Sequence, residues 1–219
     1  MSNVDKILEV LSDNRLQLLD NISMDQAARL LQVFLQQWSR WNPKINLTSE
    51  CRPEAVIENH IFDSLQYARV VTDPQGQVMD IGSGAGFPGI PLKVIFPELS
   101  LALVESQRKR ASFLRTCVRE MGLKQVAVHN LRAEEITSDH HGRFDLVLFR
   151  AVGELSHCLA LAAPFLKMGG RVCIKKETAA EAPPPVEGEG FVLALKEEIA
   201  IEGKGGKSSK LVLFQKSST

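Results

Sequence analysis

The sequence predicts an α/β protein in which helices precede a mostly parallel sheet that ends in an antiparallel hairpin. Before residue 77, apolar residues recur at helical spacing. After it, short apolar runs typical of buried strands alternate with helical patterns, the order that gives parallel strands with right-handed crossovers. Two β-type runs around a glycine-rich turn close the chain. We therefore expect seven strands, five of them parallel.

Residues 1–72 are expected to form a helical extension packed on a core of residues 73–219. Within residues 4–19, valine, isoleucine and leucine recur at helical spacing. A second helix covers residues 23–41, and a third runs over residues 53–68, where Pro53 suits a first helical turn.

The second helix carries a start signal and a stop signal. Ser23 and Gln26 make a capping box. Asn42-Pro43 should end the helix, because proline disfavours helical conformation at the residue before it.

Polar residues interrupt the apolar face of the third helix. His60 and Ser64 lie within this face, and Asp63 is one turn from His60 on the adjoining face. One interpretation is a buried histidine satisfied by a carboxylate or a carbonyl. The other is that this face meets a ligand loop and lines a cleft. Both remain open.

The core should alternate strands with helices up to a loop at residues 178–190. Its best-marked helix runs from Arg108 to Met121, with five basic residues on its outer side or near its start. A solvated face is the ordinary interpretation of such charges, and a phosphate-facing surface is the alternative. The strands are expected at residues 77–81, 101–105, 125–130, 144–149, 169–175, 191–201 and 211–215.

A glycine-rich loop follows the first strand, where residues 78–91 read V-M-D-I-G-S-G-A-G-F-P-G-I-P. Glycines allow positive φ and let a ligand approach the backbone, while the free N–H groups of the next helix point into the same space. A dinucleotide motif, G-x-G-x-x-G, is matched by Gly84, Gly86 and Gly89, with Glu105 about 20 residues on.

The phase of the turn favours another frame. Gly82 comes first after the strand, so the dinucleotide frame begins two residues late. The frame D-x-G-x-G-x-G, from Asp80 through Gly82 and Gly84 to Gly86, fits without a shift. It resembles the cofactor loop of Rossmann-like S-adenosylmethionine-dependent methyltransferases, which implies that Asp80 faces the amino-acid part of this cofactor. The terminal hairpin also favours this fold class over a dinucleotide domain.

The residues just past each strand are the candidate ligand contacts, because ligands of open α/β sheets lie over the carboxyl ends of the strands. Arg150 follows a mostly apolar strand and needs an anion there, from the protein, the cofactor or a substrate phosphate. Arg150, His60 and Asp63 are the candidate catalytic residues. The candidate cofactor contacts are Asp80, Gly82, Gly84, Gly86, Phe87, Glu105, Ser106, Ala133, Glu134 and Arg150.

Missing motifs restrict the methyl acceptor. Enzymes that methylate exocyclic amines of bases resemble one another in an N/D-P-P-Y/F segment after the fourth strand, where this chain reads F-R-A-V. Those that methylate pyrimidine C5 use a cysteine, usually as P-C, and this chain has no P-C. A ring nitrogen such as guanine N7 has a free lone pair and needs no proton removed. Alignment and electrostatics would then suffice for catalysis.

Composition excludes several other classes. The four cysteines form no C-x-x-C pair, so we expect neither a metal nor a disulfide. No apolar run reaches the roughly 18 residues of a membrane span and no signal peptide is apparent, so we expect a cytoplasmic protein. We also expect it to act as a monomer. The zero net charge argues against nucleic-acid binding by bulk charge.

Five blocks together resemble one family, the bacterial small-subunit ribosomal RNA guanine-N7 methyltransferases, or glucose-inhibited division protein B family. The resemblance implies that Gly82, Phe87, Ala133, Glu134 and Arg150 contact S-adenosylmethionine and that 16S ribosomal RNA is the partner. The chain departs from the family at Phe87, where leucine is common, at Glu105-Ser106, where Asp-Ser is usual, and at Lys210, where Arg-His often precedes the last strand. The blocks are W-N-P-K-I-N-L-T-S at 41–49, H-I-F-D-S at 60–64, D-I-G-S-G-A-G-F-P-G-I-P at 80–91, R-A-E-E at 132–135 and F-R-A at 149–151.

Three other functions stay open from the residues. The first is an S-adenosylmethionine-dependent methyltransferase that acts on another acceptor. A nicotinamide-dependent oxidoreductase would use Gly84, Gly86 and Gly89, and it would bind NADH rather than S-adenosylmethionine. A non-catalytic RNA-binding or assembly factor would hold the cofactor without turnover.

Overall fold

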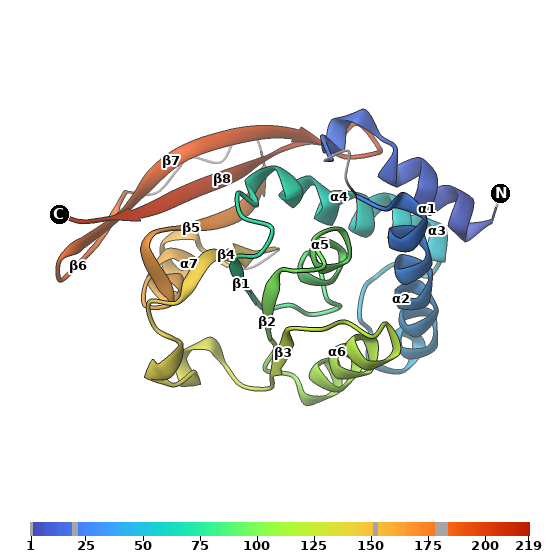
Figure 1. Cartoon of the computed structure of the whole chain (residues 1–219), viewed down its shortest axis with the longest axis horizontal. Coiled ribbons are helices and arrows are strands. Elements are labelled where there is room, and N and C mark those ends of the chain that lie inside the picture. Colours follow the sequence, from blue (N-terminus) through green and yellow to red (C-terminus); the bar gives the residue numbers. More distant parts are fainter. Residues whose placement is uncertain (1, 19–21, 151–152, 178–183) are drawn as a thin grey trace.

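The computed structural model describes residues 2–18, 22–150, 153–177 and 184–219. They form one eight-stranded sheet in the order β3-β2-β1-β4-β5-β8-β7-β6, with helices on both faces (Figure 1). The first five strands are parallel, and β7 and β8 form the predicted antiparallel hairpin. The eighth strand, β6, also runs antiparallel to β7. The strands are β1 Gln77–Ile81, β2 Ser100–Val104, β3 Val126–His129, β4 Phe144–Phe149, β5 Leu166–Glu177, β6 Val186–Gly188, β7 Phe191–Glu202 and β8 Ser208–Ser217.

The short strand β6 was not expected. It lies within residues 178–190, which the sequence predicts to be a loop, and it pairs with β7 at the sheet edge. Three residues are too few for a recognisable alternation of apolar and polar side chains. Residues 178–183 lie outside the described part of the chain.

Alternate residues of the strands enter two separate hydrophobic clusters, one on each face of the sheet. Val78 and its neighbours Leu101 and Leu146 belong to the first cluster, and Met79 belongs to the second. The N-terminal helices share the first cluster, so they pack directly on the sheet. Helices α5 (Gly89–Ile95) and α6 (Arg108–Glu120) cover this face, and α7 (Leu155–Ala162) covers the other.

The first two helices differ from the sequence prediction at their ends. Helix α1 spans Asn3–Leu11 and a 3-10 turn follows at Asn14–Leu16, so the first helix is shorter than residues 4–19 suggest. Helix α2 spans Met24–Ile45. Ser23 is its N-cap residue but makes no capping bond. Ser23 and Gln26 are both exposed, so water competes for the first-turn N–H groups.

Helix α2 also continues past the predicted stop at Asn42-Pro43. Pro43 lies in the last turn, so its missing N–H and the crowding of its ring against the carbonyl of Ser39 affect only the end of the helix. Asn46 ends the helix in the left-handed conformation, with φ 49°, and its N–H donates to the carbonyl of Asn42.

The third helical segment is confirmed, but it is not a uniform α-helix. It begins as α3 (Pro53–Val56), passes through a π-helical turn at Ile57–Ile61, resumes as α4 (Phe62–Leu65) and ends in a 3-10 turn at Gln66–Val70. The N–H of Phe62 donates to the carbonyl of Ile57, five residues back. His60 lies in this π turn, a conformation often found at functional sites. No helix among the described residues is long and apolar enough to cross a membrane.

Candidate active site

The backbone of the glycine loop supports the D-x-G-x-G-x-G frame. Gly82, Gly84 and Gly86 have φ values of 74°, 55° and 84°, which favour glycine. Gly89 is required for a different reason, because a Cβ there would lie 2.8 Å from Oδ2 of Asp80. The loop therefore turns on the first three glycines, and the fourth lets α5 pack closely on the end of β1.

Asp80 is a fully buried acid near the carboxyl end of β1. Its Oδ2 accepts a hydrogen bond of 3.1 Å from the N–H of Gly89, whereas Oδ1 has no partner among the described residues. Burial raises the pKa of Asp80 to about 7. An unsatisfied buried polar atom costs about 1–3 kcal/mol. Asp80 is thus suited to receive a donor group from a ligand, such as an ammonium.

Glu105 ties the glycine loop to the end of β2. It is 5% exposed, and its carboxylate accepts bonds from the N–H of Gly84 at 2.9 Å and of Gln107 at 2.7 Å. Asn130 donates to the carbonyls of Glu105 and Ser106, both at 3.0 Å. Each carboxylate oxygen keeps a second lone pair. Ribose binding by Glu105 therefore stays a prediction.

Residues after β3 lie at the same end of the sheet. Ala133 and Glu134 belong to a 3-10 turn at Ala133–Glu135, and Ala133 is buried in the cluster that contains Ile81 and Val104, the last residues of β1 and β2. Glu134 is exposed. The structure places this turn where the sequence predicts a ligand contact, without testing the contact itself.

Three side chains from separate segments meet beside the loop. The guanidinium of Arg150, just after β4, donates to Nδ1 of His60, and its Cζ lies 5.2 Å from the ring centroid of Phe87. The His60 ring stacks on Phe87, with centroids 5.2 Å apart and an interplanar angle of 19°. The face of the third helix that carries His60 therefore does meet the glycine loop.

Of the three anions expected for Arg150, only a carboxylate of the protein can be tested here, and the partner within the chain is the His60 imidazole. An anion from the cofactor or the substrate stays a prediction. No carboxylate of the described residues lies within ion-pair distance of Arg150. Asp63, one turn from His60, pairs with Lys175 of β5. The face of Phe87 beneath the guanidinium offers a cation–π contact in place of a carboxylate.

The protonation of His60 follows from these contacts. Burial, and next the charge of Arg150, lower the pKa of His60 to about 4, so the imidazole is neutral at pH 7. Since Nδ1 accepts from Arg150, the proton resides on Nε2. This Nε2 is buried and has no partner among the described residues. His60 therefore presents an N–H donor for which the described ranges of the chain supply no acceptor.

A cavity of about 590 Å³ adjoins these residues and is lined by His60, Asp63, Arg150 and Lys175 together with the turn between β7 and β8. Lys175 was missed from the sequence, although the signal was the same as for Arg150, since both cations stand at the carboxyl end of an apolar strand. All four cysteines are free thiols. The described residues contain no cluster of three or more side chains suited to bind a metal ion.

Comparison with protein families gives a match over most of the chain. The family model GidB, described as rRNA small subunit methyltransferase G, matches residues 27–205. A Desulfitobacterium hafniense protein named ribosomal RNA small subunit methyltransferase G is 42% identical over 163 residues, 73% of this chain and 66% of its own length. A protein of the same name from Lactococcus lactis subsp. cremoris is 33% identical over 223 residues, 97% of this chain and 90% of its own.

Solved structures share the fold at low sequence identity. A SAM-dependent methyltransferase from Aquifex aeolicus has a TM-score of 0.54 at 18% identity, covering 73% of this chain and 92% of that one. TYW2 from P. horikoshii, solved in complex with MeSAdo, has a TM-score of 0.56 at 15% identity, covering 73% of this chain and 63% of that one. The fold class predicted from the sequence is confirmed.

Proposed function

The chain belongs to the GidB family, rRNA small subunit methyltransferase G, and from this membership we propose that it transfers a methyl group from S-adenosylmethionine to N7 of a guanine in 16S ribosomal RNA. The match over residues 27–205 carries the proposal. The guanine N7 acceptor rests on the missing motifs for other acceptors and on the resemblance in the five sequence blocks.

The site has the features that S-adenosylmethionine requires. One carboxylate oxygen of Asp80 has no partner in the part of the chain that the structure describes, and the glycine loop turns beside it on three glycines. When bound, this cofactor supplies a methyl group on a positively charged sulfur. The residues that would hold it are those named from the sequence, Asp80, Gly82, Gly84, Gly86, Phe87, Glu105, Ser106, Ala133, Glu134 and Arg150.

His60, Arg150 and Asp63 are assigned to the acceptor side. Arg150 holds the His60 imidazole with its proton on Nε2. Guanine carries two neighbouring acceptors, O6 and N7. A bond from Nε2–H to O6 would leave the N7 lone pair free to attack, with no base required. Asp63 acts through Lys175, which it holds at the rim of the same cavity.

The decisive experiment maps N7 methylation in ribosomal RNA. Borohydride and aniline cleave RNA at 7-methylguanosine, and reverse transcription then stops at the cleaved position. In a strain that carries the gene for this protein, we expect one such stop in 16S RNA. The stop should disappear when the gene is deleted and return when the wild-type gene is restored. A stop that persists after deletion would refute the proposal. Its return with Arg150→Ala would instead support the non-catalytic assembly factor.

A substitution at His60 tests its role as a donor. His60→Phe keeps a ring against Phe87 but removes the N–H, so kcat should fall roughly 10²-fold, as when one preorganised donor is lost. The affinity for S-adenosylmethionine, measured by calorimetry, should change less than twofold. His157→Phe is the control, since His157 is exposed on α7. Equal kcat values for the two variants would exclude the donor role.

We also propose that the chain acts as a monomer in the cytoplasm. Light scattering should then give one species near 24.2 kDa. A mass twice that value would contradict the monomer, and recovery of the protein in a membrane fraction would contradict the cytoplasmic location.

A further inference from the structure

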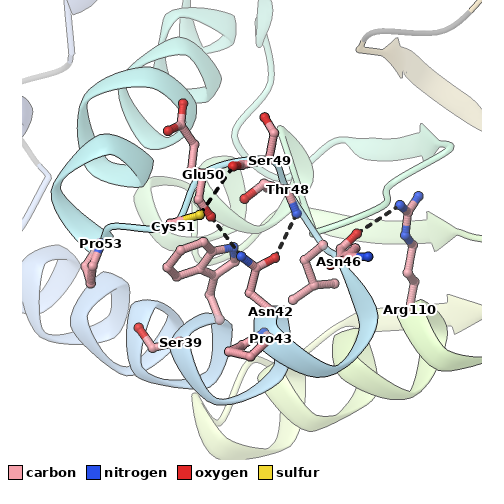
Figure 2. A pocket seen from close by; sticks show the side chains of 12 residues that line it. Ser39, Asn42, Pro43, Asn46, Thr48, Ser49, Glu50, Cys51, Pro53 and Arg110 are labelled. Atoms are coloured by element: carbon pink, nitrogen blue, oxygen red, sulfur yellow. Dashed lines mark hydrogen bonds between the residues drawn. The ribbon is translucent and has the colours of Figure 1, made fainter.

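A second cavity lies between the C-terminal half of α2 and the segment that follows it, and we call it the α2 pocket (Figure 2). Its volume is about 730 Å³, within the roughly 300–1,000 Å³ typical of small-ligand sites. Glu50 lines both this pocket and the cavity beside Arg150 and His60, so the two are neighbours.

The wall of the α2 pocket is fixed by the chain itself. The side chain of Asn42 donates to the carbonyl of Glu50 at 2.8 Å and accepts from the N–H of Thr48 at 2.9 Å. The carbonyl of Asn46 accepts from Arg110 of α6 at 3.2 Å. Figure 2 shows these bonds holding the segment of residues 46–51 over the end of α2. A pre-formed wall lowers the entropy cost of binding a ligand.

Polar groups in the lining lack hydrogen-bond partners. Trp38 is 2% exposed, and its Nε1 has no partner. The same holds for Nε of Arg110 and Oγ1 of Thr48, so three of the seven such atoms in the described residues belong to this one lining. Buried polar atoms are normally satisfied, and each exception needs an explanation. Two of the three are N–H donors, which suit a ligand with acceptor atoms.

Basic residues adjoin the lining residues in the sequence, although the whole chain has no net charge. The positions beside the lining residues carry more cations than anions, and the first-turn N–H groups of α6 lie next to Arg110. Such a rim suits phosphate groups. The exposed cations at these positions are Arg40, Lys44, Arg52 and Lys109, and the acids are Glu50 of the lining and Glu54 beside it.

We infer that the α2 pocket binds one nucleotide of the RNA substrate that neighbours the methylated guanine, with its base in the pocket and its phosphate at the basic rim. Single-stranded RNA is recognised through unstacked bases whose edges are hydrogen-bonded, and every base offers carbonyl or ring-nitrogen acceptors to N–H donors. The inference rests on the proposed function, because it takes RNA as the substrate.

Matched pairs of variants test the pocket. Arg110→Gln and Trp38→Phe change its lining, whereas Arg119→Gln and Trp41→Phe change an arginine of α6 and a tryptophan of α2 outside it. The substrates are small ribosomal subunits and protein-free 16S RNA, both prepared from a strain that lacks the gene for this protein. The two pocket variants should weaken RNA binding and raise KM roughly 5- to 150-fold, as the loss of one base contact does. The controls, and the affinity of all four for S-adenosylmethionine, should stay within twofold of the wild type.

Each outcome supports or overturns the inference. Active pocket variants with wild-type KM and RNA affinity would overturn it while leaving the proposed function intact. A raised KM for subunits with unchanged affinity for naked RNA would assign the pocket to a protein of the subunit instead. A wild-type chain that binds no S-adenosylmethionine and methylates no RNA would refute the proposed function, and the inference with it. Circular dichroism melts of the variants identify any loss of folding.

Discussion

The glycine loop and the α2 pocket lie in one molecule, but different parts of the chain determine their shapes. The loop is shaped by its backbone, with three positive φ angles within five residues. The α2 pocket is shaped by side chains, chiefly the Asn42 amide, which bonds to groups six and eight residues further on. A site shaped by backbone is visible in the sequence as a motif. A site shaped by side-chain contacts becomes visible only once the chain is folded.

The largest effect should come from a side chain placed inside the loop. In Gly86→Ala the new Cβ would lie 2.6 Å from Cδ1 of Ile90, at a φ of +84°. Left-handed strain of about 1–2 kcal/mol plus overpacking of about 1–3 kcal/mol should lower the free energy of unfolding by about 2–5 kcal/mol. Urea denaturation measures this loss, and calorimetry should show weakened S-adenosylmethionine binding.

The variant Gly122→Ala separates the effect of left-handed backbone strain from the effect of overpacking. Its φ is +63° and a Cβ there would meet nothing within 4 Å, so only the strain of about 1–2 kcal/mol applies. Equal losses in the two variants would mean that close packing at Gly86 contributes nothing to the loop.

The next effect tests the α2 pocket in the same way. Asn42→Ala leaves the N–H of Thr48 and the carbonyl of Glu50 without their partner, which should cost about 1–3 kcal/mol of unfolding free energy. RNA affinity should fall while S-adenosylmethionine affinity is kept. Asn59→Ala removes an exposed bond to the Glu50 side chain and should cost less than about 0.5 kcal/mol. If both variants lost equal stability, Asn42 would not hold the wall.

The last prediction concerns the acid beside the loop and is measured as a dependence on pH. Burial raises the pKa of Asp80 from 3.8 to about 7, so the folded state binds this proton more tightly than the unfolded state. The stability that Asp80 contributes is therefore complete below about pH 4 and is lost as the pH rises through 7.

Binding should follow the opposite direction, because the carboxylate needed by a cationic group forms only as the pH rises. S-adenosylmethionine affinity should increase up to about tenfold per pH unit below pH 7 and level off above it. Calorimetry between pH 5.5 and 8.5 checks this, and Asp80→Asn should flatten the profile. A flat wild-type profile would remove Asp80 from the contacts of the charged group.

Much of the fold could be predicted because buried parallel strands are nearly continuous apolar runs. For this reason β1 and β4 match their predicted ranges and β2 is displaced by one residue. The end of α2 was mispredicted because the rule for residues before proline is local. This rule takes no account of the hydrogen bond from the N–H of Asn46 to the carbonyl of Asn42, which closes the final turn.

The site was predictable only in part. Asp80, Phe87, Glu105 and Arg150 were named from their places at or beyond the ends of strands, and their cofactor contacts stay predictions. His60 was named as a candidate from its place in an apolar helix face, but its contact with Arg150 was not predicted, because the π turn that presents it leaves no mark in that apolar pattern. Lys175 could have been named by the same argument as Arg150, because it also stands at the carboxyl end of a predicted apolar strand.

The π turn at Ile57–Ile61 has a consequence for changes of chain length. A hydrogen bond that spans five residues accommodates one residue more than an α-helical turn. Deleting one residue there would let an ordinary helix close, so the backbone would tolerate the shorter chain. The two halves of the segment would keep nearly the same faces, because a π turn takes up its extra residue as a local bulge and not as an added step of the helix. An alignment gap of one residue at this place would mark a relative whose helix packs as before but lacks the bulge in which this chain carries its imidazole.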